Sequence, residues 1–236
     1  MDTLLQGLSQ AIHLIFSGNE ELAEIVWLSL KVSGLALLIS VVIGIPIGVL
    51  LGLARFFGRQ IAVALTYTGM GFPPVVIGLV VYLLLSRNGI LGQANLPFIP
   101  QLFTPGAMIF AQSIIAVPLV AGFTMAAVLA VDAQLIQQIR SLGATPWQTA
   151  VTVLSEARVG VIIAVVAAFG RIIAEVGAVM LVGGNIEGRT RVLTTAIVLE
   201  TGKGNFDLAI ALGIILLSMA FVVNFVMLRL QGKNEG

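Results

Sequence analysis

The chain of 236 residues contains no cysteine and only one histidine, His13. These absences exclude disulfide bridges and thiolate metal sites, and a lone histidine cannot build a histidine metal site. Charged residues make up only 10% of the chain and hydrophobic residues 58%, whereas a typical soluble domain is about 25% charged. The 12 basic and 11 acidic residues form no basic tail that would suit nucleic acid. The composition therefore predicts a protein that faces lipid over most of its surface.

The sequence signatures of several enzyme classes are missing as well. No G-x-x-x-x-G-K-[ST] phosphate loop is present: the stretch "TGKGN" lacks the following Ser or Thr, and Ile197 occupies the place of the first glycine. Neither G-x-S-x-G nor H-E-x-x-H occurs. We therefore expect no catalytic residues, no bound metal and no cofactor on this chain, and no hydrolysis of ATP by it alone.

Five apolar runs are long enough to cross a membrane, which takes about 20 residues. They cover residues 25–54, 61–85, 105–131, 159–182 and 208–228. Each run is expected to be a helix, because lipid offers no hydrogen-bond partner to the open edge of a strand. The sequence thus predicts an all-α membrane protein, a polytopic bundle of about five spanning helices that forms a single domain over residues 1–236.

The N-terminus has a weaker helical pattern. Its apolar residues recur at helical spacing and are interrupted by polar ones; they are Leu4, Leu5, Leu8, Ile12 and Ile15. No basic segment precedes them, so a signal peptide is not predicted. We expect an amphipathic helix at the membrane interface, with a short, imperfect extra span as the alternative.

Basic residues at the ends of the runs give a predicted orientation. One side of the membrane would hold six of them, namely Arg55, Arg59, Arg140, Arg158, Arg229 and Lys233, and the other side five, namely Lys31, Arg87, Arg189, Arg191 and Lys203. Cytoplasmic loops carry the excess of Lys and Arg. The count favours the first side as cytoplasmic, with the N-terminus outside and the C-terminus inside.

Proline and glycine interrupt three of the runs, at Gly44-Ile45-Pro46, at Pro73-Pro74 and at Pro118. Such residues are common in membrane helices and need no special role. They can also kink helices around a pathway and allow helices to approach closely. The sequence leaves these two interpretations equally open.

The polar segment 132–158 predicts a helix, a turn and a second helix. Gly143 suits the end of the first helix, where a left-handed residue is needed. Thr145 can cap the second helix, and Pro146 fits its first position. Trp147 follows on this short helix, where it could anchor at the interface or fill a pocket on a partner.

This segment resembles the cytoplasmic coupling loop of ABC importer permeases, with the pattern EAA, three residues, Gly, nine residues, then I-x-L-P. Gly143 matches the glycine and Val153 stands for the isoleucine, whereas Gln138 and Ile139 replace the alanines and Ser155-Glu156 replaces Leu-Pro. The resemblance implies that Gly143, Ala144, Thr145, Pro146 and Trp147 couple this chain to a separate ATPase subunit. ATP and Mg would bind to that partner.

A second resemblance covers nearly the whole chain from residue 25. The stretch "EVGAVMLVGGNIEGRTRVLTTAIVLETGKGNFD" is similar to the permeases for molybdate and tungstate, and most similar to the tungstate branch. The resemblance implies the type I importer permease fold in a prokaryotic cell membrane and import of tungstate, with molybdate or sulfate as alternatives. It also implies a homodimer of this chain, two copies of the ATPase and an extracytoplasmic substrate-binding protein.

Arg171 and Glu175 interrupt the fourth run. A charge near the bilayer centre costs at least about 2.5–3.5 kcal/mol, so both side chains should face the bundle interior or a watery cavity. Four residues apart on one helix, they can pair. The pair could orient the helix, or it could lie by the pathway and be remade as the pathway opens. We assign Arg171, Glu175 and Gly177 to a structural or gating role, favoured over direct contact with the anion.

The loop after this run carries Asn185, Arg189 and Arg191. Their roles are either those of an ordinary solvated loop or those of a docking surface for the binding protein. One rival function is an ion-coupled secondary transporter that works alone, for which only Glu175 could carry the ion. Another is a membrane enzyme or scaffold, which the missing catalytic residues disfavour.

Overall fold

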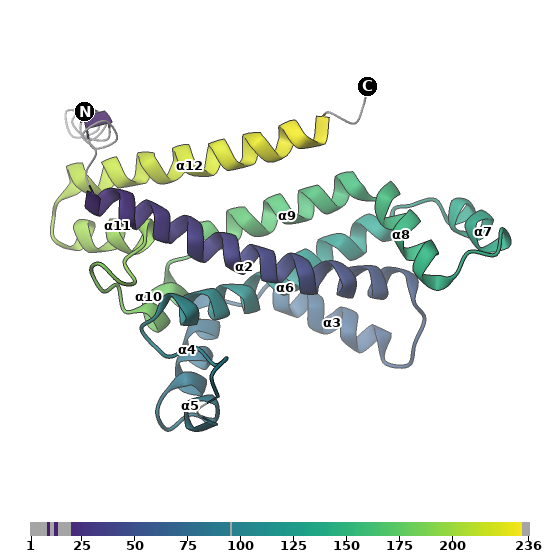
Figure 1. The fold of residues 1–236 in the computed structure, drawn as a ribbon, viewed down its shortest axis with the longest axis horizontal. Coiled ribbons are helices and arrows are strands. Elements are labelled where there is room, and N and C mark those ends of the chain that lie inside the picture. Colours follow the sequence, from purple (N-terminus) through teal and green to yellow (C-terminus); the bar gives the residue numbers. More distant parts are fainter. Residues whose placement is uncertain (1–8, 10–11, 14–19, 95, 233–236) are drawn as a thin grey trace.

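Long apolar helices dominate the computed structural model, which describes residues 9, 12–13, 20–94 and 96–232 (Figure 1). The helices are α2 (Glu20–Leu53), α3 (Arg59–Met70), α4 (Pro74–Leu85), α5 (Ile90–Ala94), α6 (Pro105–Leu129), α7 (Ala133–Ser141), α8 (Pro146–Glu156), α9 (Arg158–Ile173), α10 (Gly177–Gly183), α11 (Leu193–Gly202) and α12 (Phe206–Gly232). No strand occurs within the described ranges. The prediction of an all-α membrane protein is confirmed. The predicted N-terminal amphipathic helix lies, apart from Ser9, Ile12 and His13, outside the described residues.

Four helical stretches are long and apolar enough to cross a membrane: α2, α4 with α5, α6, and α12. The pair α8 and α9, bent by 72°, makes a fifth if it counts as one broken span. The predicted runs 25–54, 105–131 and 208–228 correspond to α2, α6 and α12, as expected. The other two predicted runs, 61–85 and 159–182, are each broken into two helices.

The break in the second predicted run falls at Gly71–Pro73, so the expected single helix over 61–85 is wrong. Proline lacks the backbone N–H that continues a helix, and it disfavours the helical conformation in the residue before it. Pro74 accordingly begins α4, and Pro73 before it is extended, with φ −63° and ψ 121°. Pro46 and Pro118, by contrast, lie inside the continuous helices α2 and α6.

Small residues let α2 and α6 pack closely along their length. A Cβ added to Gly48 of α2 would lie 2.6 Å from the carbonyl oxygen of Ala121, which is closer than real Cβ atoms approach. Gly44 and Gly52 meet Val120 and Val128 of α6 in the same way. The absence of a side chain at these glycines therefore allows the two helices to pack closely.

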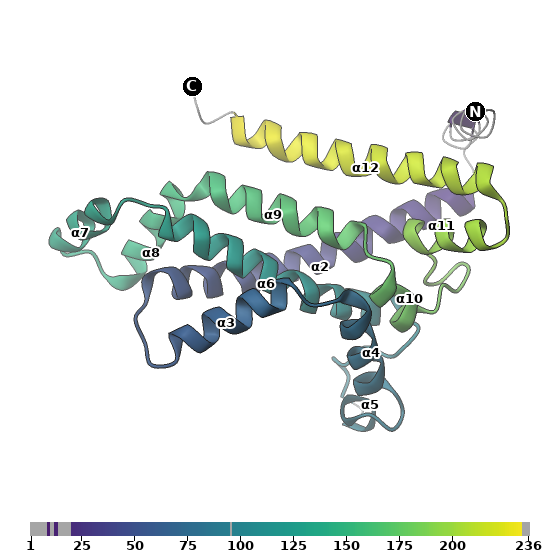
Figure 2. The same ribbon diagram turned by 180° about the vertical axis from the view of Figure 1, so that it is seen from behind.

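The polar segment 132–158 and the loop that follows α10 lie at opposite ends of the molecule. α9 lies beside α2 and α6, with α12 along its outer side (Figure 1). α7 and α8 form one end, and α11 with the start of α12 forms the other, while α4 and α5 project sideways (Figure 2). The long helices thus connect the polar segment 132–158 to the loop that follows α10.

Candidate functional site

Local hydrogen bonds build the turn between α7 and α8 as the sequence predicts. Asp132 caps α7, where its Oδ1 accepts from the backbone N–H of Gln134 at 2.8 Å. Gly143 has φ +84°, the left-handed conformation that glycine adopts without strain. Thr145 caps α8 in a capping box with Gln148, and Pro146 is the first helical residue. The predicted helix, turn and helix are confirmed.

α8 rests on the membrane helices through one face only. Thr149 and Val153 are buried, and Val153 packs in a cluster with Val128 of α6 and Ala157. Trp147 is 77% exposed, and it lines an open, largely apolar cavity together with Pro46 and Leu50 of α2. The predicted coupling residues Gly143, Thr145, Pro146 and Trp147 are exposed, and Ala144 is half-buried. This end of the chain therefore presents an aromatic side chain on a helix that leads, through the 72° bend, directly into α9.

The fourth predicted run is interrupted at residues 174–176, so the expected continuous helix over 159–182 is wrong. Polar groups from other helices satisfy the backbone at this break. Gln112 of α6 donates its Nε2 to the carbonyl oxygen of Ile172 at 3.0 Å, at the end of α9. Thr194 of α11 donates its hydroxyl to the carbonyl oxygen of Glu175 at 3.0 Å. These bonds allow a helix to end inside an apolar bundle.

Glu175 and Arg171 lie differently from the expected pair. The Glu175 side chain is 5% exposed, and its Oε1 accepts from the backbone N–H of Ala178 at 3.0 Å, at the start of α10. Arg171 is exposed on α9, and the described part of the chain holds no ion pair between the two residues. They do not share a helical face because α9 ends at Ile173.

Gly177 begins α10 and lies directly against α4. A Cβ on Gly177 would come within 2.5 Å of Cγ2 of Val75. Gly78 of α4 meets the backbone of Ala178 just as closely, at 2.6 Å. Gly177 of α10 and Gly78 of α4 therefore allow these two helices to pack in close contact.

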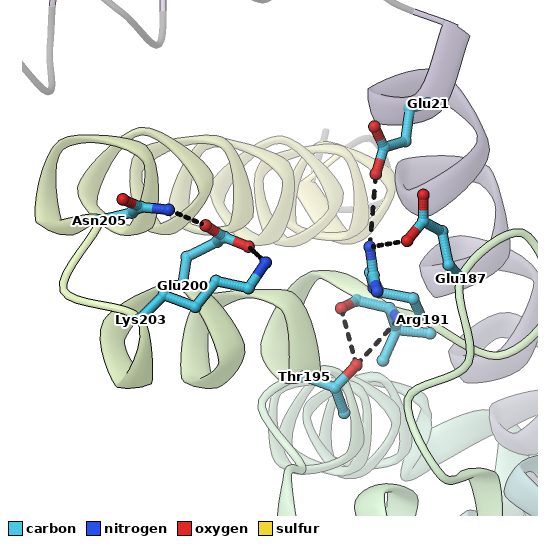
Figure 3. A network of polar contacts seen from close by, with 8 residues as sticks. Glu21, Glu187, Arg191, Thr195, Glu200, Lys203 and Asn205 are labelled. Carbon is cyan, nitrogen blue, oxygen red and sulfur yellow. Dashed lines mark hydrogen bonds and ion pairs between the residues drawn. The ribbon is translucent and has the colours of Figure 1, made fainter.

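The loop after α10 is held by an internal hydrogen bond, an internal ion pair and one ion pair to α2. The Thr190 hydroxyl donates to the carbonyl oxygen of Gly183 at 2.6 Å. Arg191 is paired with Glu21 at 3.4 Å and with Glu187 at 3.3 Å, and 15% of its side chain is exposed (Figure 3). Arg191 therefore fixes the loop to the start of α2.

The other two predicted loop residues are placed differently from Arg191. Arg189 is exposed. Asn185 is half-buried in the left-handed region, at φ +51°. The structure thus brings all three into one loop at the end of the molecule opposite to α8, with Arg189 as the member that faces outward.

A second polar cluster near this loop centres on Glu200 of α11. Its Oε1 accepts from Nζ of Lys203 and its Oε2 from Nδ2 of Asn205, both at 2.7 Å (Figure 3). The hydrogen bond from Asn205, together with that from Lys203, lowers the pKa of the Glu200 carboxyl below its ordinary value. The cluster joins the end of α11 to the turn before α12.

Two residues of these sites were missed by sequence reasoning. Gln112 is the amide of the largely apolar third run, and an amide in a span is a signal for an interhelical hydrogen bond. Glu200 is an acid three residues before Lys203, a spacing that favours pairing on a helix. Both signals were present, but the partner of Gln112 lies 60 residues away in the sequence.

Comparisons with known proteins identify the relatives of this chain. It is 43% identical over 220 residues to a probable anion ABC transporter permease protein of Haloferax volcanii, covering 91% of this chain and 93% of the relative. It is 37% identical over 231 residues to the tungstate uptake system permease protein TupB of Peptoclostridium acidaminophilum, covering 98% of this chain and 99% of the relative. Identity to the molybdenum transport system permease protein ModB of Escherichia coli is 32% over 176 residues, covering 73% and 77%.

Solved structures share the fold. A chain of a bacterial alginate ABC transporter, in complex with a periplasmic protein that holds an alginate pentasaccharide, superposes with a TM-score of 0.77 at 21% identity, covering 96% of this chain and 85% of that one. A chain of the MetNI methionine ABC transporter gives a TM-score of 0.72, also at 21% identity, covering 91% and 96%. The expected importer permease fold is confirmed.

A family match covers most of the sequence. The family described as binding-protein-dependent transport system inner membrane component matches residues 44–235. This match agrees with the apolar spanning helices and with the expected place of the protein as a multi-pass protein of the cell membrane. The chain therefore belongs to the family of inner membrane components of binding-protein-dependent transport systems.

Proposed function

We propose that this chain is the membrane-spanning subunit of an ABC importer for a tetrahedral oxyanion, tungstate in the first place and molybdate in the second. The observation that carries the proposal is the full-length similarity to a tungstate permease, 37% over 98% of this chain. Sulfate is a more distant alternative, since a sulfate permease of Escherichia coli is 29% identical over 92% of the chain.

We propose that a separate ATPase subunit supplies the energy and docks on Gly143 to Trp147. The exposed Trp147 is the anchor of this contact, because aromatic side chains that fill a partner's pocket carry much of the binding energy in interfaces. Movement of α8 would reach α9 through the bend at Ala157, since α8 and α9 are consecutive helices. Two ATPase subunits, which bind ATP and Mg, would serve a homodimer of this chain.

The opposite end of the molecule is the proposed docking surface for an extracytoplasmic binding protein. Arg189 is exposed there, and Asn185 and Arg191 belong to the same loop. Exposed basic side chains attract the acidic rim of a partner and steer its approach. Arg191 contributes by holding the loop in place through Glu21 and Glu187.

The broken helix α9–α10 is the proposed gate. Glu175 and Gly177 set the start of α10, through the bond to Ala178 and the close contact with α4. Arg171 lies 13 residues after the start of α9, about 20 Å along the helix axis. An exposed arginine at this depth is costly against lipid, so we place it at the pathway that two copies of the chain would enclose.

The rival function, an ion-coupled secondary transporter, requires a membrane carboxylate that is free to bind and release its ion. Glu175 is 5% exposed, and one of its oxygens is bonded to the backbone of α10. Release of an ion from this carboxylate would disturb the start of a helix. The geometry therefore favours a structural role for Glu175.

Uptake of radiolabelled tungstate by cells tests the proposed substrate. Cells that express the chain with its ATPase and binding protein should take up tungstate, with molybdate as the stronger competitor and sulfate as the weaker one. Uptake that sulfate abolishes and molybdate leaves unchanged would contradict the order of substrates.

A further inference from the structure

A basic cavity of about 660 Å³ lies where α2, α3, α6 and α7 meet. Its charged lining consists of Arg55, Arg59 and Arg140, which come from three different segments of the chain. No described acidic residue lines it. The remaining lining is largely apolar and includes Leu53, Leu129 and Ile136. Such a combination of cations and apolar side chains suits an amphiphilic anion.

The three arginines have no counter-charge in the part of the chain that the structure describes. Arg59 donates its Nε to the carbonyl oxygen of Leu51 at 2.8 Å, which fixes this guanidinium at the end of α2. Arg55 and Arg140 are exposed, and none of the three forms an ion pair with a described residue. Asp132, at the start of α7, does not line the cavity, and its Oδ1 accepts from Gln134.

Guanidinium groups that line one cavity repel one another, and an anion bound there would relieve this repulsion. A guanidinium presents a planar fork of donors that matches the oxygens of a phosphate group. The cavity also lies at the ends of two spanning helices, since Leu53 ends α2 and Leu129 ends α6. Helix ends lie at the depth of the lipid headgroups, where basic pockets between helices bind acidic lipids.

We propose that this cavity binds one anionic phospholipid per chain, with its phosphate against the arginines and its acyl part against the apolar lining. The inference goes beyond the proposed transport function and does not depend on the transported anion. A lipid in this position would contact both the end of α2 and α7. α7 is the first helix of the polar segment 132–158, which contains the proposed docking residues. Carboxylates of a docked ATPase are a less suitable occupant, because they would leave the apolar lining without a partner.

Native mass spectrometry of the full-length protein, purified in detergent with the subunits it retains, tests the site. The probes are palmitoyl-oleoyl phosphatidylglycerol, phosphatidylcholine with the same chains, and inorganic phosphate. The test variant is Arg55→Gln/Arg140→Gln, which keeps the structural bond of Arg59. The control variant Lys31→Gln/Arg87→Gln removes two exposed basic side chains elsewhere.

We expect the wild type and the control variant to retain one phosphatidylglycerol per chain in preference to phosphatidylcholine. The test variant should bind phosphatidylglycerol about 30-fold more weakly, because each arginine contributes about 1 kcal/mol towards an acidic lipid. Equal binding of both lipids, or displacement of phosphatidylglycerol by millimolar inorganic phosphate, would overturn the proposal. Loss of the ATPase from the test variant with an unchanged lipid preference would overturn it too, and would assign the arginines to ATPase docking.

Discussion

Three side chains of the candidate sites differ in their exposure and in the contacts that they make. Trp147 is exposed on a helix whose other face is buried, so its apolar surface is available to a partner. Glu200 is the reverse case, a buried carboxylate whose two oxygens are both hydrogen-bonded. Glu175 is a third case, a carboxylate used to start a helix inside the bundle. These three roles give different expectations for substitution.

Replacement of Trp147 by alanine should weaken binding of the ATPase without unfolding the permease. An aromatic anchor at the centre of an interface contributes about 2 kcal/mol or more, so we expect the affinity to fall about 30-fold. Trp27→Ala is the matched control, because Trp27 is 67% exposed at the opposite end. Surface plasmon resonance with the purified ATPase measures the effect, and equal affinities for the two variants would refute the docking role of Trp147.

Acid should destabilise the protein in part through Glu200. The pKa of Glu200 is lowered in the folded state by its hydrogen bonds to Asn205 and Lys203. A group of this kind contributes stability above its unfolded pKa, and the contribution is lost as the pH falls through the folded pKa. Thermal unfolding in detergent between pH about 7 and about 3 measures this loss. Glu200→Gln should lower the Tm at neutral pH and reduce the fall of the Tm with acid. The control Glu24→Gln should follow the wild type. Parallel curves of Tm against pH for all three proteins would argue against this role of Glu200.

At the scale of helices, hydropathy predicts the spans α2, α6 and α12 because their apolar runs are long and unbroken. The turn at Gly143 is also predictable, since its capping residues lie within a few positions of one another. The break at 174–176 is not, because the groups that stabilise it come from elsewhere in the sequence. Gln112 is 60 residues from its partner at the end of α9, and Thr194 is 19 residues from Glu175. Hydrophobic periodicity contains no information on such tertiary bonds.

The effect of an alanine substitution on stability should differ from one glycine of α2 to another, according to what the added Cβ would meet. Gly48→Ala should destabilise the fold by about 1–3 kcal/mol, because its Cβ would meet backbone atoms of α6 that cannot turn away. Gly34→Ala on the same helix is the control, since nothing lies within 4 Å of its added Cβ and alanine favours the helix. Urea or thermal unfolding in detergent measures both. A Gly48 variant as stable as the Gly34 variant would show that the close packing is not required.

At the scale of the whole molecule, the two candidate sites lie at opposite ends, and long apolar helices connect them. α12 exposes large apolar side chains along its outer side, for example Leu217 at 72% and Phe221 at 69%. Such a surface needs lipid or another protein chain around it. The exposed residues Gly143 to Trp147, at the opposite end from Arg189, are where we propose that an ATPase subunit docks. Under the proposed function, the protein is one subunit of a larger assembly.

Co-purification from native membranes tests this central claim most directly. The chain, affinity-tagged at its C-terminus and extracted in mild detergent, is analysed by quantitative mass spectrometry of the proteins that accompany it. We predict an ABC ATPase subunit in equal amount, and its loss from the Trp147→Ala variant but not from Trp27→Ala. Recovery of the chain alone, or only with itself, would contradict the account and make a transporter that works without an ATPase the better explanation.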